Sequence, residues 1–192
     1  MHQLVDLALI CTGWAWAAGE LLLQLHEQLS SERTERTERR SLVVLLALLA
    51  GGTTLATLTR HEVTALSYPV HGQVLRGAVL AVASAGIALR LWSVITLGRF
   101  FRVAVHIQHE HRVVSSGPYR WMRHPAYGGL LLAVLGYSVL FGNALSWLLI
   151  AACCLTAVGY RIHVEERMLL DGLGEEYRAY AGRTRRLIPG VW

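Results

Sequence analysis

The sequence predicts an all-α integral membrane protein, a helical bundle with about five transmembrane helices. Of its 192 residues, 54% are hydrophobic and 16% are charged, whereas a soluble domain carries about a quarter charged residues. The mean hydropathy is +0.40, and several apolar runs approach the ~20 residues that a helix needs to cross a bilayer. Because these helices are short and closely connected, we expect one membrane domain over residues 1–192.

Five apolar runs are the predicted membrane helices, and they cover residues 4–25, 42–58, 74–97, 127–141 and 145–161. The last two belong to one run that is too long for a single span, and the sequence Phe141-Gly142-Asn143-Ala144 supplies a turn near its middle. Helix 127–141 is short for a perpendicular crossing. The chain therefore divides into three N-terminal spans, residues 1–97, and a region of residues 98–192 with a polar loop, a helical hairpin and a charged tail.

Small residues within the spans predict where helices approach each other. Gly51-Gly52 lies at the centre of the second span, where we expect two backbones to come close. In the third span, Gly77, Ala81 and Ala85 recur at four-residue spacing, which predicts a helix-packing face.

Two charged residues lie inside predicted spans. Glu20 is costly in lipid, so we expect it to face the bundle or to lie near the end of the first span. Arg90 either snorkels to the membrane interface or points inward toward a ligand cavity. The sequence leaves both orientations of Arg90 open.

The distribution of arginine predicts the topology. The chain contains no lysine, loop 26–41 holds four arginines, loop 98–126 holds five, and the tail from residue 161 onward holds six. The opposite side receives only Arg60 and Arg76. The positive-inside rule then places the N-terminus outside, and the 98–126 loop and the tail together in the cytoplasm. Topology also explains the net charge of +5 without a nucleic-acid partner.

Residues 115–127 form a dense patch of polar, cationic and aromatic groups directly before the fourth span. Gly117-Pro118 and His124-Pro125 interrupt it, and proline disfavours the helical conformation of the residue before it, so we expect a shaped connection here. Residues able to stack or hydrogen-bond, beside two arginines, suit a small polar ligand with a flat ring. The alternative is an interfacial anchor, because Trp, Tyr and Arg commonly mark the membrane boundary.

The tail offers a second polar cluster on the same side. Arg161 and Glu165 have the i,i+4 spacing of one helix face where the fifth span emerges. The alternative is a snorkelling arginine with solvated carboxylates. Further on, Gly174 predicts a helix break, and Tyr177 and Tyr180 predict an amphipathic segment that closes over the membrane face or lies along the interface.

These elements resemble the isoprenylcysteine carboxyl methyltransferase family. The resemblance rests on Gly117-Pro118-Tyr119, Arg123-His124-Pro125-Ala126-Tyr127, Glu165-Glu166, and Gly174-Glu175-Glu176-Tyr177 with Tyr180, preceded by Gly98-Arg99-Phe100-Phe101 and His111-Arg112-Val113-Val114. It covers about residues 98–190 and implies a membrane methyltransferase that uses S-adenosylmethionine and releases S-adenosylhomocysteine. The short chain resembles a prokaryotic-type member, which implies a bacterial or archaeal cell membrane with the active site at its cytoplasmic face.

The resemblance also implies roles for individual residues. Cofactor binding falls on His106, His111, Arg112, Val113, Val114, Tyr119, Arg123, His124, Pro125, Ala126, Tyr127 and Glu165. A length difference before His111 leaves Gln108 as a competitor for the position of His106. Arg161 is implied to face the acceptor carboxylate, so Arg161 and Glu165 are the predicted catalytic residues. The acceptor is implied to be lipophilic, with a prenylated molecule as a candidate.

These roles are consistent with the chemistry. Tyr119 and Tyr127 offer rings for a flat adenine, and Glu165 offers a carboxylate for an ammonium group. A carboxylate acceptor is ionised at pH 7, so its methylation needs alignment and a cation such as Arg161 rather than a strong base. A lipid-anchored acceptor is expected to enter sideways between helices.

Other functions remain open at this stage. A phospholipid or amine acceptor would need a base, for which His163 and Glu166 are candidates. A sterol-reductase-like enzyme would use NADPH, and a non-enzymatic scaffold would use the basic loop to bind lipid headgroups. We predict no metal site, because His106, His109 and His111 have loose spacing and only Glu110 accompanies them.

Overall fold

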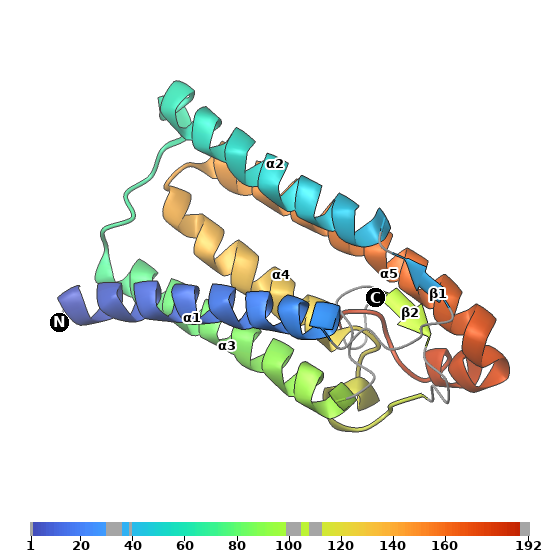
Figure 1. Ribbon diagram of the computed structural model, residues 1–192. Coiled ribbons are helices and arrows are strands. Elements are labelled where there is room, and N and C mark those ends of the chain that lie inside the picture. Colours follow the sequence, from blue (N-terminus) through green and yellow to red (C-terminus); the bar gives the residue numbers. More distant parts are fainter. Residues whose placement is uncertain (1, 30–35, 39, 99–104, 108–112, 189–192) are drawn as a thin grey trace.

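The computed structural model describes residues 2–29, 36–38, 40–98, 105–107 and 113–188 (Figure 1). Its long helices are α1 (His2–Leu29), α2 (Arg40–Glu62), α3 (Gln73–Leu97), α4 (Pro125–Ser138) and α5 (Ala144–Ala181). Short 3₁₀ helices are η1 (Thr64–Leu66), η3 (Gly117–Arg120) and η4 (Val139–Phe141). The prediction of a helical membrane bundle is confirmed.

In the part of the chain that the structure describes, four helices are long and apolar enough to cross a membrane. They are Gln3–Leu23 within α1, and α2, α3 and α5, whereas the fifth apolar stretch, Pro125–Phe141, is shorter. This agrees with the predicted order of spans and with the short fourth one. The prediction that the last helix of the hairpin ends near residue 161 is wrong, because α5 is 38 residues long and reaches Ala181. Gly174 interrupts this helix at φ 53°, a left-handed conformation that glycine adopts readily, so the predicted break at Gly174 is confirmed.

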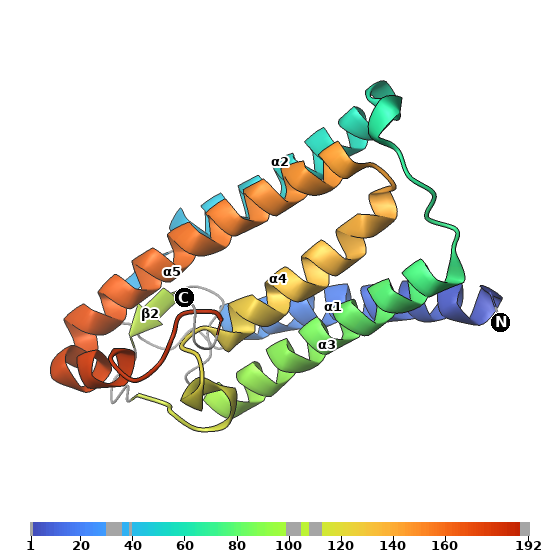
Figure 2. The ribbon, with the colours of Figure 1, turned by 180° about the vertical axis from the view of Figure 1, so that it is seen from behind.

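The helices form two packed groups (Figures 1 and 2). In one group α2 packs along α5, and in the other α1 and α4 pack against α3. The second half of α5, the strands and η3 gather at one end of the molecule, opposite the chain's N-terminus. The polar loop and the tail therefore meet at one end, as the arginine distribution predicts.

A small antiparallel sheet joins two loops at this polar end. Strand β1 (Arg36–Glu38) pairs with β2 (Val105–Ile107), with Thr37 opposite His106. These strands were not expected from the sequence. Because β2 also packs against α5, the sheet ties the connection between α1 and α2 to the end of the molecule where loop and tail meet.

Glycine brings α3 and α4 into backbone contact. A Cβ atom added at Gly86 would lie 2.6 Å from the Ala133 nitrogen, and one at Gly129 would lie 2.6 Å from the Gly86 oxygen. Small residues allow this approach, and helix association in lipid depends on such packing because apolar burial offers little driving force there.

The predicted packing face of α3, with Gly77, Ala81 and Ala85, is wrong. Ala81 and Ala85 are exposed, and a Cβ at Gly77 would meet nothing within 4 Å. The buried face of α3 consists of Val79, Ala83, Gly86, Arg90 and Ser93. By contrast, the predicted close approach at Gly51-Gly52 is confirmed for Gly52, where an added Cβ would lie 2.9 Å from the Cys153 Cβ.

A buried ion pair links α1, α3 and α4. Arg90 is 8% exposed and points inward, where its Nε and Nη2 donate to the two carboxylate oxygens of Glu20, the second at 2.6 Å. Its Nη1 donates to the Ala126 oxygen in the first turn of α4 at 3.2 Å. The inward orientation of Arg90 is therefore the one observed, and the pair satisfies two charges that would be costly in lipid if they were separated.

The contact between α3 and α4 can be tested with two neighbouring glycines. Gly129→Ala should lower the thermal midpoint in detergent, because its new methyl group collides with backbone, a kind of overpacking that costs roughly 1–3 kcal/mol. Gly128→Ala is the control, since its Cβ would have only ordinary contacts at 3.9 Å with Leu89 and Met122. It should leave the midpoint unchanged or raise it. Equal midpoints for the two variants would contradict the backbone contact.

Candidate active site

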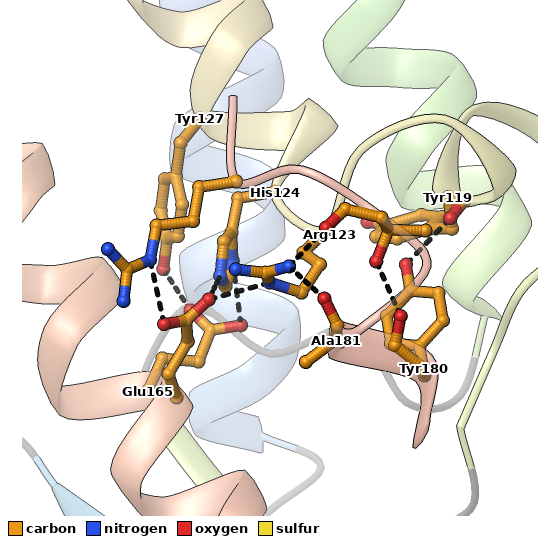
Figure 3. A network of polar contacts seen from close by, with 10 residues as sticks. Tyr119, Arg123, His124, Tyr127, Glu165, Tyr180 and Ala181 are labelled. Atoms are coloured by element: carbon orange, nitrogen blue, oxygen red, sulfur yellow. Dashed lines mark hydrogen bonds and ion pairs between the residues drawn. The ribbon is translucent and has the colours of Figure 1, made fainter. Parts of the chain in front are cut away.

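The site is built where the chain enters α4 and meets the end of the tail. Backbone pairing aligns the two segments, since the Arg123 and His124 nitrogens donate to the Arg185 and Arg186 oxygens at 2.7 and 3.0 Å. Pro125 begins α4 and His124 is its N-cap residue, in accord with the preference for proline at the first helical position. This pairing points Arg123 and His124 toward α5 (Figure 3).

Glu166 is the centre of the ion-pair network. Its carboxylate accepts from the Arg123 Nε at 2.8 Å and from the Arg186 Nε at 2.9 Å, and its side chain is only 11% exposed. The His124 Nε2 lies 3.3 Å from the same carboxylate. Charge-assisted hydrogen bonds of this kind offset the cost of burying a carboxylate. Glu166 thereby joins α5 to the segments on both sides of it.

Arg123 also holds the C-terminal segment, residues 182–188, in place. Its Nη1 donates to the Ala181 oxygen at 2.8 Å and to the Thr184 oxygen. The Ala181 carbonyl belongs to the last turn of α5, where backbone oxygens lack helical partners, and Thr184 follows the helix. Arg123 therefore links the start of α4 to the end of α5 through hydrogen bonds.

A second chain of contacts connects Glu165 to Arg161. The Tyr127 hydroxyl donates to Glu165 Oε2 at 2.7 Å and accepts from the Arg161 Nε at 2.7 Å. The Arg161 Nη1 donates to the Ser41 hydroxyl of α2 at 3.2 Å, and Arg161 is 2% exposed. The His124 Nδ1 lies 3.8 Å from Glu165 Oε1, so one imidazole lies between the two neighbouring carboxylates.

Tyr119 borders this network at η3. It is buried, and its backbone oxygen accepts from the Tyr180 hydroxyl at 2.7 Å (Figure 3). Burial, followed by the negative charge of Glu165, raises the pKa of Tyr119 far above its ordinary value. Its phenol is therefore neutral across the physiological pH range and is suited to packing and hydrogen bonding rather than to proton abstraction.

Comparison with known proteins gives this site a context. Residues 78–171 match the family model described as the isoprenylcysteine carboxyl methyltransferase (ICMT) family. A probable protein-S-isoprenylcysteine O-methyltransferase of Oryza sativa subsp. indica is 32% identical over 114 residues, 58% of this chain and 60% of the relative. Protein-S-isoprenylcysteine O-methyltransferase B of Arabidopsis thaliana is 35% identical over 108 residues, 55% of each chain.

A solved structure of the eukaryotic intramembrane Ras methyltransferase ICMT shares the fold, with a TM-score of 0.63 and 26% identity over 76% of this chain. Residues 78–171 are therefore similar to the isoprenylcysteine carboxyl methyltransferase family. The chain spans 60%, 55% and 52% of the lengths of these three proteins. All three are eukaryotic, so the bacterial or archaeal origin stays a prediction.

The structure brings most of the residues predicted from the family resemblance to one place. Arg123, His124, Tyr127, Arg161 and Glu165 form the contacts described above, although they come from segments about 40 residues apart in sequence: the hydrogen bond of Tyr127 with Glu165 spans 38 positions. Tyr119, Pro125 and Ala126 are buried beside them.

The remaining predicted residues precede η3. The Val113 nitrogen donates to Glu176 Oε1 at 3.1 Å, and Val114 is half-buried. His106 lies in β2 opposite Thr37, but its side chain lies outside the described part of the structure, as do Gln108, His111 and Arg112.

Several contributors to the site were not among the predicted site residues. Glu166 appeared only as a possible base for an amine acceptor, Glu176 only within the family motif, and Ser41 and Arg186 not at all. Glu166 and Glu176 could have been found from the sequence, since both lie in the motifs that carry the family resemblance, within α5. For Ser41 and Arg186, a lone serine and a tail arginine offer no pattern that distinguishes a contact from a solvated side chain.

A metal site finds no support in the described residues. Among them, no group of three or more His, Cys, Asp or Glu side chains is placed to hold a metal ion. The side chains of His106, His109 and His111 lie outside these residues, so the absence of a metal stays a prediction.

The role of Glu166 can be tested against an exposed glutamate on the same helix. Glu166→Gln should lower the thermal midpoint in detergent, because Arg123 and Arg186 lose a buried counter-charge, a loss worth roughly 3 kcal/mol. Glu175→Gln is the control, because the Glu175–Arg178 pair has side chains 83% and 66% exposed, and exposed pairs contribute little. If the midpoint of Glu166→Gln were as close to wild type as that of Glu175→Gln, Glu166 would not be the stabilising counter-charge of Arg123 and Arg186.

Proposed function

We propose that this protein is an S-adenosylmethionine-dependent methyltransferase that methylates the carboxylate of an isoprenylcysteine-like acceptor at the membrane face. One observation carries the proposal: the Tyr127 hydroxyl bridges Glu165 and Arg161, with both hydrogen bonds at 2.7 Å. A carboxylate suited to an ammonium and a cation suited to a carboxylate are thereby separated by a single phenol. Such proximity of two recognition groups is what a two-substrate transfer requires.

We assign binding of the methyl donor's ammonium group to Glu165 rather than to Glu166. The Glu165 side chain is 27% exposed, whereas that of Glu166 is 11% exposed and already holds two arginines. Glu165 is therefore the carboxylate that a ligand's ammonium group can reach, and Tyr119 and Tyr127 supply aromatic rings beside it. When bound, S-adenosylmethionine supplies a methyl group on a sulfonium, and this donor set fits its charged and aromatic parts.

We assign binding of the acceptor carboxylate to Arg161. Its guanidinium is fixed in direction by Tyr127 and by Ser41, and a planar guanidinium recognises a carboxylate with defined geometry. The acceptor carboxylate is ionised at neutral pH, so the residues here need to orient it and keep water away, and no proton has to be removed.

An amine or phospholipid acceptor is less well served by this site. Such an acceptor needs a base, but His163 is exposed and Glu166 is paired with Arg123 and Arg186. The topology completes the proposal: the arginine-rich loop and tail support a cytoplasmic site with the N-terminus outside.

Donor binding can be measured directly by calorimetry with S-adenosylhomocysteine and detergent-purified protein. Wild type should bind, and His124→Ala and Glu165→Gln should bind at least about tenfold more weakly, because each loses a charged or polar contact worth roughly 1.5–3 kcal/mol. Glu175→Gln should bind like wild type. Folded wild-type protein that binds no S-adenosylhomocysteine under several lipid conditions would contradict the proposed donor, and NADPH would be the next ligand to test.

Acceptor recognition can be measured with labelled S-adenosylmethionine and N-acetyl-S-farnesylcysteine, with the corresponding carboxamide as the control acceptor. The acid should be methylated and the amide should not. Arg161→Lys should reduce kcat/KM for the acid by about tenfold or more, because lysine keeps the charge but loses the planar fork. Its affinity for S-adenosylhomocysteine should stay within about twofold of wild type. An equal loss in both measurements would contradict the assignment of Arg161 to the acceptor.

A further inference from the structure

Tyr177 has a buried hydroxyl that the contacts described above do not use. Tyr177 is 4% exposed, and its hydroxyl oxygen is buried without a hydrogen-bond partner among the described residues. A buried polar group left in this way costs about 1–3 kcal/mol, so the oxygen calls for an explanation. Tyrosine hydroxyls elsewhere in the fold have partners: Tyr180 donates to the Tyr119 oxygen and Tyr68 to the Val139 oxygen, at 2.7 and 2.8 Å.

The kink at Gly174 turns Tyr177 toward the site. After this residue the end of α5 changes direction and folds back toward η3 (Figure 2). Tyr177, Tyr180 and Ala181 are three and four positions apart, so they share a face of this last helical piece. The Tyr180 side chain on this face donates to the Tyr119 oxygen of η3, and the Ala181 backbone oxygen accepts from Arg123, so this end of α5 lies against η3 and the start of α4.

The surroundings of the Tyr177 hydroxyl are those of the donor site. Its ring lies 6.0 Å from the ring of Tyr180. The charged side chains within electrostatic range of its hydroxyl include Glu166, Glu165 and Arg123. Arg123 and Glu166 are paired with each other, whereas Glu165 is the more exposed of the two carboxylates. The hydroxyl thus lies within electrostatic range of the group assigned above to the ammonium of the donor.

We propose that Tyr177 is a further donor-binding residue, whose hydroxyl hydrogen-bonds the amino-acid end of S-adenosylmethionine. This inference rests on the proposed function. The ammonium and the carboxylate of that end are attached to one carbon atom, so a partner of the carboxylate has to lie close to the partner of the ammonium. A neutral phenol donates to the ligand's carboxylate without adding charge beside Glu165 and Glu166.

The experiment is Tyr177→Phe, which removes the hydroxyl alone. The variant should bind S-adenosylhomocysteine about tenfold more weakly, as expected for a lost hydrogen bond to a charged group. Its ligand-free thermal midpoint should equal or exceed that of wild type, because an unsatisfied buried oxygen has been removed. Tyr68→Phe is the matched control: it loses a satisfied bond far from the site, so it should lower the midpoint and leave the affinity unchanged.

A second ligand identifies which end of the donor is involved. 5′-Methylthioadenosine lacks the amino-acid end, so wild type and Tyr177→Phe should bind it equally. The same loss for both ligands would overturn the amino-acid assignment, and an unchanged affinity for S-adenosylhomocysteine would overturn the role of Tyr177 while leaving the proposed function intact. Wild type that binds no S-adenosylhomocysteine would overturn the proposed function and this assignment with it.

Discussion

The buried carboxylate of Glu166 is the group on which the polar end of this protein depends. Removing a carboxylate from water costs several kcal/mol, and this cost is offset only when the charge is paired and hydrogen-bonded. Arg123 and Arg186 supply that pairing from the two segments that flank the hairpin of α4 and α5. Each segment is thereby held against α5, and with them the first turn of α4, from which His124 and Tyr127 reach the site.

The adjacent residues Glu165 and Glu166 of α5 consequently have different roles. Successive residues of a helix point about 100° apart, so Glu166 faces the C-terminal segment while Glu165 faces Tyr127. The two carboxylates differ in exposure, 11% against 27%, and therefore in what they can bind. A Glu-Glu pair in the sequence does not reveal which member is structural, and here the partner arginines decide it.

The sequence was sufficient to predict the helical bundle, the order of the spans, the break at Gly174 and the meeting of loop and tail. These features follow from hydrophobic length, turn residues and arginine placement, which act locally. The packing face of α3 was not predicted, because spacing of small residues alone does not select one face of a helix. Arg90 would have identified the buried face, because a charge in a membrane helix faces the bundle interior. Gly86, Ala83 and Val79 lie on the same face of α3 as Arg90.

The site was partly predictable for a related reason. Motif resemblance pointed to His124, Tyr127, Arg161 and Glu165 before their contacts were known. It also implied cofactor binding for Arg123, but it did not indicate the bonds of Arg123 to Glu166 and to the carbonyls of Ala181 and Thr184. Tertiary partners that lack a local pattern, such as Ser41 on α2, emerge only when the helices are assembled.

The length of α5 fits the proposed acceptor, which would lie partly in the membrane. Residues 144–173 of α5, before the kink at Gly174, extend about 45 Å, whereas the hydrocarbon core is about 30 Å thick, so α5 continues beyond the apolar layer. Arg161 follows the apolar part of this helix, and Glu165 lies about one turn further on. A molecule that keeps its tail in lipid and presents a carboxylate at the surface would meet Arg161 first, with Tyr127 and Glu165 directly behind it. A helix that crosses this boundary therefore sets the distance between the residues proposed for the acceptor and those proposed for the cofactor.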